Sequence, residues 1–445
     1  MVLPTEALFL LADWIGQPAH VAALQVFEKP RGAGEGFVGE LYEKMVCDTG
    51  SDPLFRKHPA SVFGVGQFFW TRDEDIDLRR HVHRTVVAEP GGRAQLMDTV
   101  SRLHTRRLDR GRPLWEVHLL DGCADVFGVY FKIHHSLVDG VSGQRLAHRV
   151  LSENPASRRV HGLWRPLENE LGGGGSTVRE TFRALAAGVN TRAAPIRLAR
   201  AVFREPISLA FAAPSSVLNK PVSEGRRCAV RSWPAARIDR VRRLRGASMN
   251  DVILAMASGA LRAYLAERDA LPRRSLIAAV PISLRAKGDR GERGGNKVGA
   301  TLCTLATDVP DPERRLETIR ASMARSKDVY RSLTSAQALA LTATLFAPVG
   351  FALVPGVGRM VSPPFNVMVS SVPTDRRRLY LDGARLIATY PISQVFDGQT
   401  LNLSVFVNSD NLDFGLVGCA RSVPHMHRIL DHLEHALREL ETSRS

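Results

Sequence analysis

Cysteine is scarce in this sequence, with five residues among 445, all far apart along the chain. Cys47, Cys123, Cys228, Cys303 and Cys419 form no C-x-x-C pair, so their spacing indicates neither a disulfide framework nor a zinc ribbon. Few and scattered thiols are typical of a reducing compartment. We therefore expect a cytoplasmic protein.

We also expect neither a signal peptide nor an uninterrupted membrane-spanning run in this sequence. The apolar residues at its start have no basic leader and lie between Glu6 and Asp13, which predicts the first helix of a folded domain. Residues 332–358 carry no charge, but Pro348 and Pro355 interrupt them. Two short buried or interfacial helices fit this segment better than one spanning helix.

Aromatic residues make up only 7% of the chain and do not alternate with its basic runs. A stacking platform for single-stranded nucleic acid needs that alternation. The formal charge of +15 at pH 7 still asks for an anionic partner: nucleic acid, an acidic membrane surface or a phosphorylated substrate. A basic nucleic-acid-binding protein is the weaker of these alternatives.

What the chain does contain is the composition of a globular protein, with 44% hydrophobic and 24% charged residues. Four glycines and a serine at 172–176 predict a linker, and strand-like and helix-like runs alternate on both sides of it. We expect two α/β lobes, 1–165 and 226–445. Residues 166–225 join them and hold the glycine linker and a basic helical crossover.

The strongest local motif is HHSLVDG (134–140), between a strand-like run at 126–133 and a helix-like run. A strand-to-helix turn can expose an imidazole at the edge of a sheet. A histidine there, neutral near pH 7, can take the proton from a hydroxyl that attacks a carbonyl. Asp139 can fix the tautomer, lock the turn by an ion pair or cap the helix, and Gly140 leaves room for the turn.

Two other interpretations of this motif stay open. The paired histidines can be core residues with satisfied hydrogen bonds, or His118, His134, His135 and Asp139 can bind a metal. A metal site draws its ligands from more than one element, and His118 is the one further candidate nearby, so this is the less favoured interpretation. We expect no metal.

HHSLVDG resembles the HHxxxDG signature shared by acyl-CoA-dependent acyltransferases, chloramphenicol acetyltransferases and the condensation domains of peptide synthetases. Further motifs follow a definite order: RPLWE (112–116), Asn250-Asp251, VPISLR (280–285), LYLDGARL (379–386) and LDFGLVG (412–418). The whole set resembles the bacterial wax ester synthase/diacylglycerol acyltransferase family. This resemblance implies an α/β (α+β) fold of two chloramphenicol-acetyltransferase-like lobes, each a mixed sheet flanked by helices, with the active site in a channel between them.

The resemblance also implies roles for individual residues of the motif. His135 corresponds to the general base, and His134 to its neighbour. Asp139 corresponds to the acid that holds the site together by an ion pair and does not itself carry the proton. Gly140 completes the motif.

Three residues outside this motif are further candidates. Trp115 of RPLWE can line the acyl channel, although a core aromatic residue is the favoured interpretation. Asn250 and Asp251 match the Asn-Asp pair of the family. Asn250 can donate to the developing oxyanion, or it can cap a helix that begins at Asp251.

The implied reaction moves a fatty acyl group from acyl-CoA, a co-substrate, to a lipid hydroxyl, with no other cofactor. Diacylglycerol would yield triacylglycerol, and a long-chain alcohol would yield a wax ester. The sequence has no G-x-S-x-G motif to suggest a covalent intermediate. The alternatives are polyketide-derived diols or carrier-bound substrates as reactants, and a non-catalytic lipid-surface protein on the same fold.

The chain departs from the family pattern at two places. Residues 19–21 read Ala-His-Val where the family has Met-His-Val, and residues 371–375 read Ser-Val-Pro-Thr-Asp where it tends to have Asn-Val-Pro-Gly-Pro. The second departure puts the acceptor preference in question, and not the acyl-transfer step.

Basic residues are concentrated after the linker, with 15 Lys and Arg against 4 Asp and Glu in residues 176–250. This predicts a surface for anionic lipid headgroups, shared with the phosphates of CoA. We expect peripheral attachment through the basic amphipathic segment 177–212 and the apolar stretch 336–354. The sites would be the inner face of the plasma membrane or lipid inclusions, with no nucleic acid partner.

Overall fold

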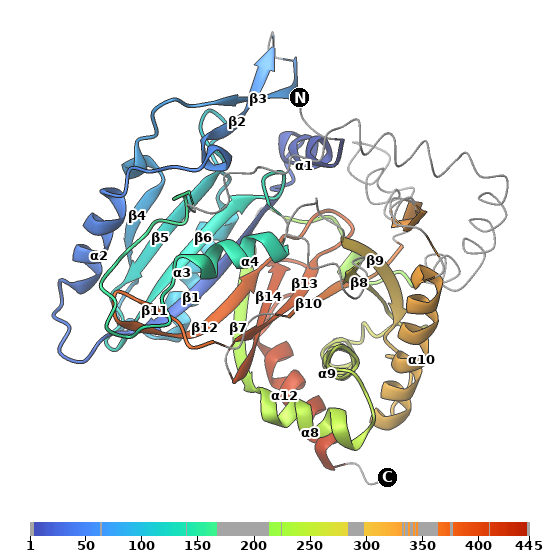
Figure 1. Cartoon of the computed structure of the whole chain (residues 1–445). Coiled ribbons are helices and arrows are strands. Elements are labelled where there is room, and N and C mark those ends of the chain that lie inside the picture. The colour runs from blue at the N-terminus through green and yellow to red at the C-terminus, as the bar shows by residue number, and fades with distance from the viewer. Residues whose placement is uncertain are drawn as a thin grey trace.

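The computed structural model describes most of both predicted lobes (Figure 1). The described residues are 4–62, 65–138, 140–166, 213–223, 225–283, 298–331, 333, 337–338, 341–342, 344–345, 364–373, 377–408 and 410–442. The predicted glycine linker, the basic segment 177–212, most of the apolar stretch 336–354 and Asp139 lie outside the described residues. The predictions made for those residues stay predictions.

Two six-stranded sheets form the framework, in the orders β11-β12-β1-β6-β5-β4 and β7-β14-β13-β10-β8-β9. Both sheets are mixed, because β4 runs parallel to β5 and β10 runs parallel to β8 and β13. The first sheet consists of β1 (His20–Glu28), β4 (Val82–Val86), β5 (Trp115–Asp121), β6 (Val126–His134), β11 (Tyr380–Leu381) and β12 (Ala384–Ile392). The second consists of β7 (Arg226–Pro234), β8 (Ile277–Ser283), β9 (Val298–Thr304), β10 (Val367–Val372), β13 (Leu401–Asn408) and β14 (Asn411–Cys419).

Helices flank both sheets (Figure 1), which confirms the predicted mixed α/β architecture. The helices are α1 (Pro4–Trp14), α2 (Phe37–Val46), α3 (Arg93–Thr105), α4 (Gly140–Arg149), α8 (Ala235–Leu244), α9 (Met249–Ala266), α10 (Pro312–Arg331) and α12 (His427–Thr442). Helix α9 is apolar nearly all round, and α8, α10 and α12 pack against it beside the second sheet. A helix without a polar face is stable only when it is buried in this way.

The two sheets do not divide the chain at the predicted boundary. Strands β11 and β12 belong by sequence to the predicted C-terminal lobe, yet β12 pairs antiparallel with β1 in the first sheet. Without β12, β1 would be an edge strand with unpaired backbone groups. The division into 1–165 and 226–445 therefore needs a correction for residues 380–392, because hydrogen bonding between strands, and not chain order, decides which sheet they join.

Strand β12 also makes the direct contact between the two sheets. A Cβ atom on Gly415 of β14 would collide with the carbonyl oxygen of Pro391 in β12, so glycine is required for this approach. The side chain of Asp413 in β14 accepts the backbone N–H of Thr389 at 2.7 Å. Helix α3 of the first lobe packs on β7 of the second.

The concentration of arginines after the linker is not a uniform cationic surface in its described half. Residues 226–250 hold eight arginines and one acidic residue, but four of these arginines form ion pairs with acidic residues elsewhere in the fold and a fifth pairs with Asp239. The ion pairs are Arg227–Asp98, Arg231–Asp431, Arg237–Glu434, Arg237–Glu441, Arg242–Asp239 and Arg245–Glu313. These ion pairs reduce the net positive charge of residues 226–250, and the predicted surface for anionic lipid headgroups stays a prediction.

No helix within the described residues combines the length and hydrophobicity needed to cross a bilayer.

Candidate active site

The HHSLVDG motif begins at the end of β6, in the middle of the first sheet. Strand β6 lies between β1 and β5 and is buried over nearly its whole length. The backbone N–H of His134 donates to Leu114 at 3.0 Å, and that of His135 donates to Ala19 at 2.8 Å. Both neighbouring segments therefore hold the main chain where the strand turns toward α4, as the motif predicted.

His135 lies just beyond the strand and is partly exposed. Its imidazole stacks on the ring of Phe9 from α1, with ring centroids 4.3 Å apart and an angle of 11° between the planes. Helix α1 therefore covers one face of the imidazole. An aromatic face against the ring restricts its orientation.

His134 lies in a different environment, since only 2% of the residue is exposed. Its Nδ1 atom lies 2.6 Å from the hydroxyl of Ser136 and 3.2 Å from the backbone N–H of the same residue. Burial first, and then the charges of His135 and Arg110, lower the pKa of His134 to about 3. His134 is thus a neutral residue of the interior, whereas His135 is the histidine of the pair that lies toward the surface.

A cluster of buried basic side chains lies on the face of the first sheet that carries His134. His20 donates through Nε2 to the carbonyl oxygen of His104 at 2.8 Å. Lys132, which is 1% exposed, donates to the carbonyl oxygens of Leu103 and Arg106 at 3.2 and 3.1 Å. Both side chains meet the last carbonyl groups of α3, where cationic and donor groups are favoured.

Glu116 balances this cluster. Its Oε2 atom lies 3.0 Å from Nζ of Lys132 and 3.5 Å from Nε2 of His118. Burial would raise the pKa of Glu116, but the hydrogen bond from His118 and the charge of Lys132 lower it to about 2. Burial lowers the pKa of Lys132 despite its acidic partner.

Sequence reasoning missed this cluster, although β6 contained a signal for it. Tyr130, Lys132 and His134 alternate along a strand that is otherwise apolar, which places all three on one face. A lysine at such a position must be paired in the interior. The partners were not predictable, because Glu116, Leu103 and Arg106 come from other elements.

Trp115 is fully buried in the first lobe. Its Nε1–H donates to the carbonyl oxygen of Phe55 at 2.8 Å, and its ring stacks on His81 and Trp164, with centroids 4.4 and 5.2 Å apart. These contacts are those of the core aromatic residue favoured by the sequence. A place in an acyl channel stays a prediction.

Asn250 and Asp251 lie at the start of α9 in the second lobe, where they have separate roles. Ser248, and not Asn250, is the N-cap, and Asp251 completes a capping box by accepting the backbone N–H of Ser248 at 2.8 Å. The helix begins at Met249, so of the two alternatives for Asn250 the one in which it caps a helix beginning at Asp251 is wrong, and the oxyanion role stays a prediction. The Oδ1 atom of Asn250 accepts the hydroxyl of Ser371 at 2.9 Å.

Two other predicted positions concern the turn and a metal. Helix α4 begins at Gly140, the last residue of the motif, while Asp139 lies outside the described residues. His118, a candidate metal ligand, lies 3.0 Å through Nδ1 from the hydroxyl of Thr85 and faces Glu116 through Nε2. Among the residues that the structure describes, no group of three His, Cys, Asp or Glu side chains has the arrangement of a metal site.

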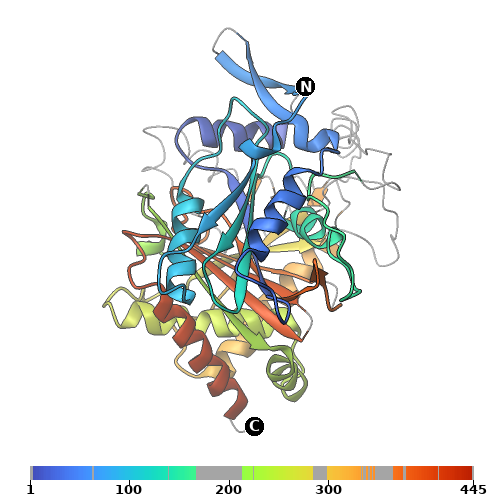
Figure 2. The same cartoon turned by 90° about the vertical axis from the view of Figure 1, so that its left-hand side faces the viewer.

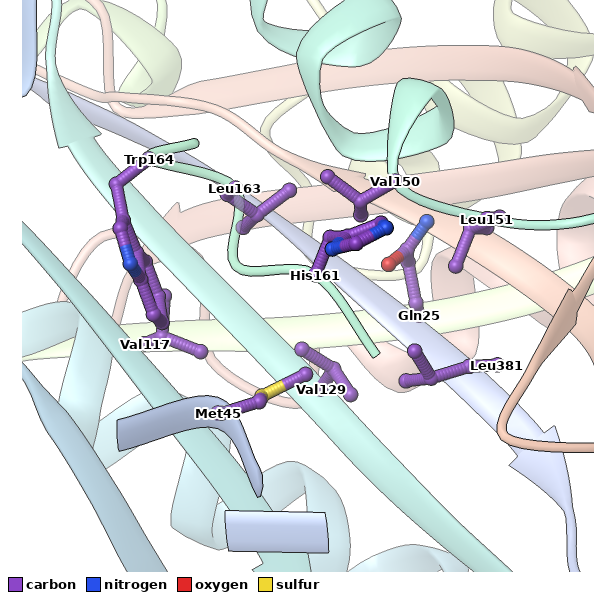
Figure 3. A pocket seen from close by; sticks show the side chains of 10 residues that line it. All are labelled: Gln25, Met45, Val117, Val129, Val150, Leu151, His161, Leu163, Trp164 and Leu381. Carbon is purple, nitrogen blue, oxygen red and sulfur yellow. The ribbon is translucent and has the colours of Figure 1, made fainter. Parts of the chain in front are cut away.

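A mostly apolar pocket lies on the opposite face of the first sheet, between the strands and the chain after α4 (Figure 3). It leaves free space of only about 10 Å³, close to what one water molecule needs. Its lining comprises Gln25, Met45, Val117, Val129, Val150, Leu151, His161, Leu163, Trp164 and Leu381. In this conformation it is a packing gap and not a chamber for an acyl chain.

Comparison with known protein families agrees with this geometry. Residues 2–253 match the wax ester synthase/diacylglycerol acyltransferase catalytic domain, and residues 294–441 match the C-terminal domain of the same family. The chain belongs to the wax ester synthase/diacylglycerol acyltransferase family. The resemblance inferred from the sequence motifs is thereby confirmed, and the protein is an acyltransferase.

Individual relatives cover nearly the whole chain. A Mycobacterium tuberculosis protein named as a probable diacylglycerol O-acyltransferase is 46% identical over 99% of this chain and 98% of its own. The solved wax ester synthase/diacylglycerol acyltransferase from Marinobacter aquaeolei is 34% identical, with a TM-score of 0.78 over 99% of this chain and 98% of that one. The first condensation domain of the CDA synthetase, 13% identical with a TM-score of 0.64, shares the two-lobed fold.

Proposed function

We propose that this acyltransferase moves a fatty acyl group from acyl-CoA to a lipid hydroxyl, with His135 as the general base. The observation behind this proposal is the contrast within the His pair. His134 is buried and neutral, while His135 lies at the turn beyond the sheet and is partly exposed. The partial exposure of His135, against the burial of His134, supports His135 as the imidazole that meets the substrate.

The proposed chemistry needs no covalent enzyme intermediate. The imidazole of His135 takes the proton of the acceptor hydroxyl as its oxygen attacks the thioester carbonyl carbon. The tetrahedral oxyanion collapses with cleavage of the carbon–sulfur bond, and His135 returns the proton to the leaving thiolate of CoA. Asn250 is our candidate donor to the oxyanion, because Ser371 occupies its Oδ1 atom and so directs its amide N–H groups elsewhere.

The remaining motif residues support this site in the proposal. Asp139 holds the turn by an ion pair, and Gly140 starts α4. Trp115 and His134 support the adjoining strands from the interior. Asp251 fixes the start of α9, next to Asn250.

The acceptor is proposed to be diacylglycerol, a long-chain alcohol or both, giving triacylglycerol or wax ester. The names of the relatives support this range, since one is called a diacylglycerol O-acyltransferase and another a wax ester synthase/diacylglycerol acyltransferase. Polyketide-derived diols and carrier-bound substrates remain the second candidate within the superfamily. Diacylglycerol and long-chain alcohols are reached at a lipid surface. We therefore propose a cytoplasmic protein attached peripherally to the plasma membrane or to lipid inclusions.

The direct test is His135→Ala in the full-length protein, assayed with palmitoyl-CoA and dioleoylglycerol. Loss of the general base should lower turnover by about 10²–10⁴-fold. His435→Ala is the matched control, because His435 lies on α12 with a side chain that is 70% exposed. Near-wild-type turnover of the His135 variant would remove the proposal. Product analysis with a panel of alcohols, diols and diacylglycerols then identifies the acceptor.

A further inference from the structure

Exposed large apolar side chains are concentrated on one part of the molecule. Among the described residues, five such side chains are well exposed, and three of them lie on α1 and on strand β3 of a separate hairpin. They are Leu11 (50% exposed), Trp14 (68%) and Phe69 (48%). Helix α1 and β3 contact each other, and large apolar side chains that stay exposed on contacting elements mark a surface that meets another apolar phase or a partner.

The hairpin that carries Phe69 projects from the first lobe. It consists of β2 (Lys57–Val62) and β3 (Val65–Arg72), which pair with each other and with neither large sheet. Figures 1 and 2 show it projecting beyond the first lobe, above α1. The sequence from Pro59 to Thr71 contains no charged residue.

Two cationic side chains lie opposite each other at the base of this hairpin, just before the acidic residues 73–75. Lys57 and Arg72 face each other in the strand register. Like charges directly across a strand pair repel, so an anion between or above them stabilises the arrangement. Within the described residues, no ion pair joins either side chain to an acidic partner of this chain, whereas the adjacent His58 pairs with Asp73 at 2.9 Å.

Helix α1 links this surface to the turn that holds His135. Phe9 of α1 stacks on His135, while Leu11 and Trp14, three residues apart, share an exposed side of the helix. The indole N–H of Trp70 in β3 donates to Glu6 of α1 at 3.1 Å, which joins the hairpin to the helix. Leu10 belongs to a small buried cluster against which both Trp70 of the hairpin and Leu137 of the motif pack.

We propose that α1 and the β2–β3 hairpin dock the enzyme onto an anionic lipid surface. Leu11, Trp14 and Phe69 enter the interface, and Lys57 and Arg72 bind the phosphates of anionic lipids; these five residues are the α1–hairpin surface. Aromatic and aliphatic side chains beside cations are what such an interface selects. The inference rests on the proposed lipid acceptor, which this surface would present next to His135.

Tryptophan fluorescence tests the docking directly. Trp115, Trp164 and Trp233 are at most 1% exposed, so added vesicles can reach only Trp14 and its partly buried neighbour Trp70. Vesicles of phosphatidylcholine and phosphatidylglycerol with brominated acyl chains should quench the emission of the full-length protein. Trp14→Phe should lose most of this quenching. Equal quenching in wild type and variant would contradict insertion of α1.

Flotation with the same vesicles measures binding. The triple variant Leu11→Ser, Trp14→Ser, Phe69→Ser should bind at least about tenfold more weakly. The double variant Val86→Ser, Leu244→Ser is the matched control. These residues are 68% and 65% exposed, and they lie outside the proposed surface, on β4 and at the end of α8. Lys57→Gln and Arg72→Gln should each weaken binding about fivefold, and on anionic vesicles only. Thermal melting checks that every variant is folded.

Two acceptors separate the failure of docking from the failure of the proposed function. The triple variant should lose turnover of dioleoylglycerol in vesicles far more than turnover of a water-soluble short-chain alcohol. A wild type inactive on both acceptors would refute the proposed function, while flotation and quenching would still decide the docking. Unchanged flotation of the triple variant, or a change in its oligomeric state by light scattering without a change in flotation, would overturn the docking.

Discussion

His134 and His135 are adjacent in sequence, but the end of β6 lies between them and gives them different chemistry. Burial holds the pKa of His134 at about 3, so this imidazole stays neutral throughout the pH range in which enzymes are assayed. An acidic limb in the pH–rate profile would therefore come from another group. The sequence singled out the pair, but only the position of the strand end separates an interior histidine from one beside the surface.

The role of Ser371 follows from its hydrogen bond to Asn250. It stands where the family tends to have Asn, and its hydroxyl donates to Oδ1 of Asn250. We expect Asn250→Ala to lower kcat by about 10²–10³-fold if its amide binds the oxyanion. Ser371→Ala should cost only about 2–10-fold, because it loosens one hydrogen bond.

The double variant distinguishes a shared role from two separate ones. If Ser371 acts through Asn250, removing both should lower kcat no further than removing Asn250 alone. Steady-state kinetics with saturating acyl-CoA measures all four proteins. Independent, multiplying losses would show that Ser371 does not position Asn250.

At the scale of elements, the carboxyl end of α3 depends on buried basic side chains from β1 and β6. Lys132 satisfies two terminal carbonyl groups of the helix and pairs with Glu116 at 3.0 Å. Burying this ion pair costs desolvation free energy. Removing one partner destabilises the fold still more, because it leaves a buried unpaired charge. Helix α3 also packs on β7 of the second sheet, so its position contributes to the contact between the lobes.

We expect Lys132→Met to destabilise the protein by about 3–5 kcal/mol, since Glu116 and two carbonyl groups lose their partner. Adding Glu116→Gln should recover part of that loss, because the unpaired carboxylate is gone. Urea unfolding measures the free energies. Lys220→Met is the control, since Lys220 is exposed, and should shift stability by less than about 0.5 kcal/mol. A Lys132 variant as stable as this control would contradict the argument.

At the scale of the whole molecule, Asp413 lies where the two sheets meet. It accepts Thr389 N–H of β12 at 2.7 Å and the hydroxyl of Ser232 in β7 at 2.5 Å. Burial raises the pKa of Asp413 from an ordinary 3.8 to about 6. The native state therefore binds this proton more tightly than the unfolded chain, and the stabilisation is complete below pH 4 and lost as the pH rises through 6.

This sign gives a prediction for Asp413→Asn. Between pH 4 and pH 7, the unfolding free energy of the wild type should fall relative to this variant, by at most about 3 kcal/mol. Denaturant unfolding at several pH values measures the difference, in which other titrating groups cancel. A flat difference between the wild type and Asp413→Asn over this pH range would show that the pKa of Asp413 is not raised.

The sequence by itself determined the family, the mixed α/β architecture and the strand-to-helix turn of the motif, because these depend on local order: HHSLVDG follows a buried strand and precedes a helix. It also indicated that Trp115 is a core residue. Each of these inferences uses the alternation of side chains or the spacing of residues that are neighbours along the chain.

Only the tertiary structure decided which distant residues meet. It placed β12 in the first sheet and paired several arginines of 226–250 with acidic residues elsewhere. It showed that Asn250 accepts a hydrogen bond from Ser371 and that Ser248 is the N-cap of α9. It also brought α1 into contact with β3 of the hairpin. Periodicity reports which face a side chain takes, but the partner on that face comes from another part of the chain, because strand pairing and burial select it.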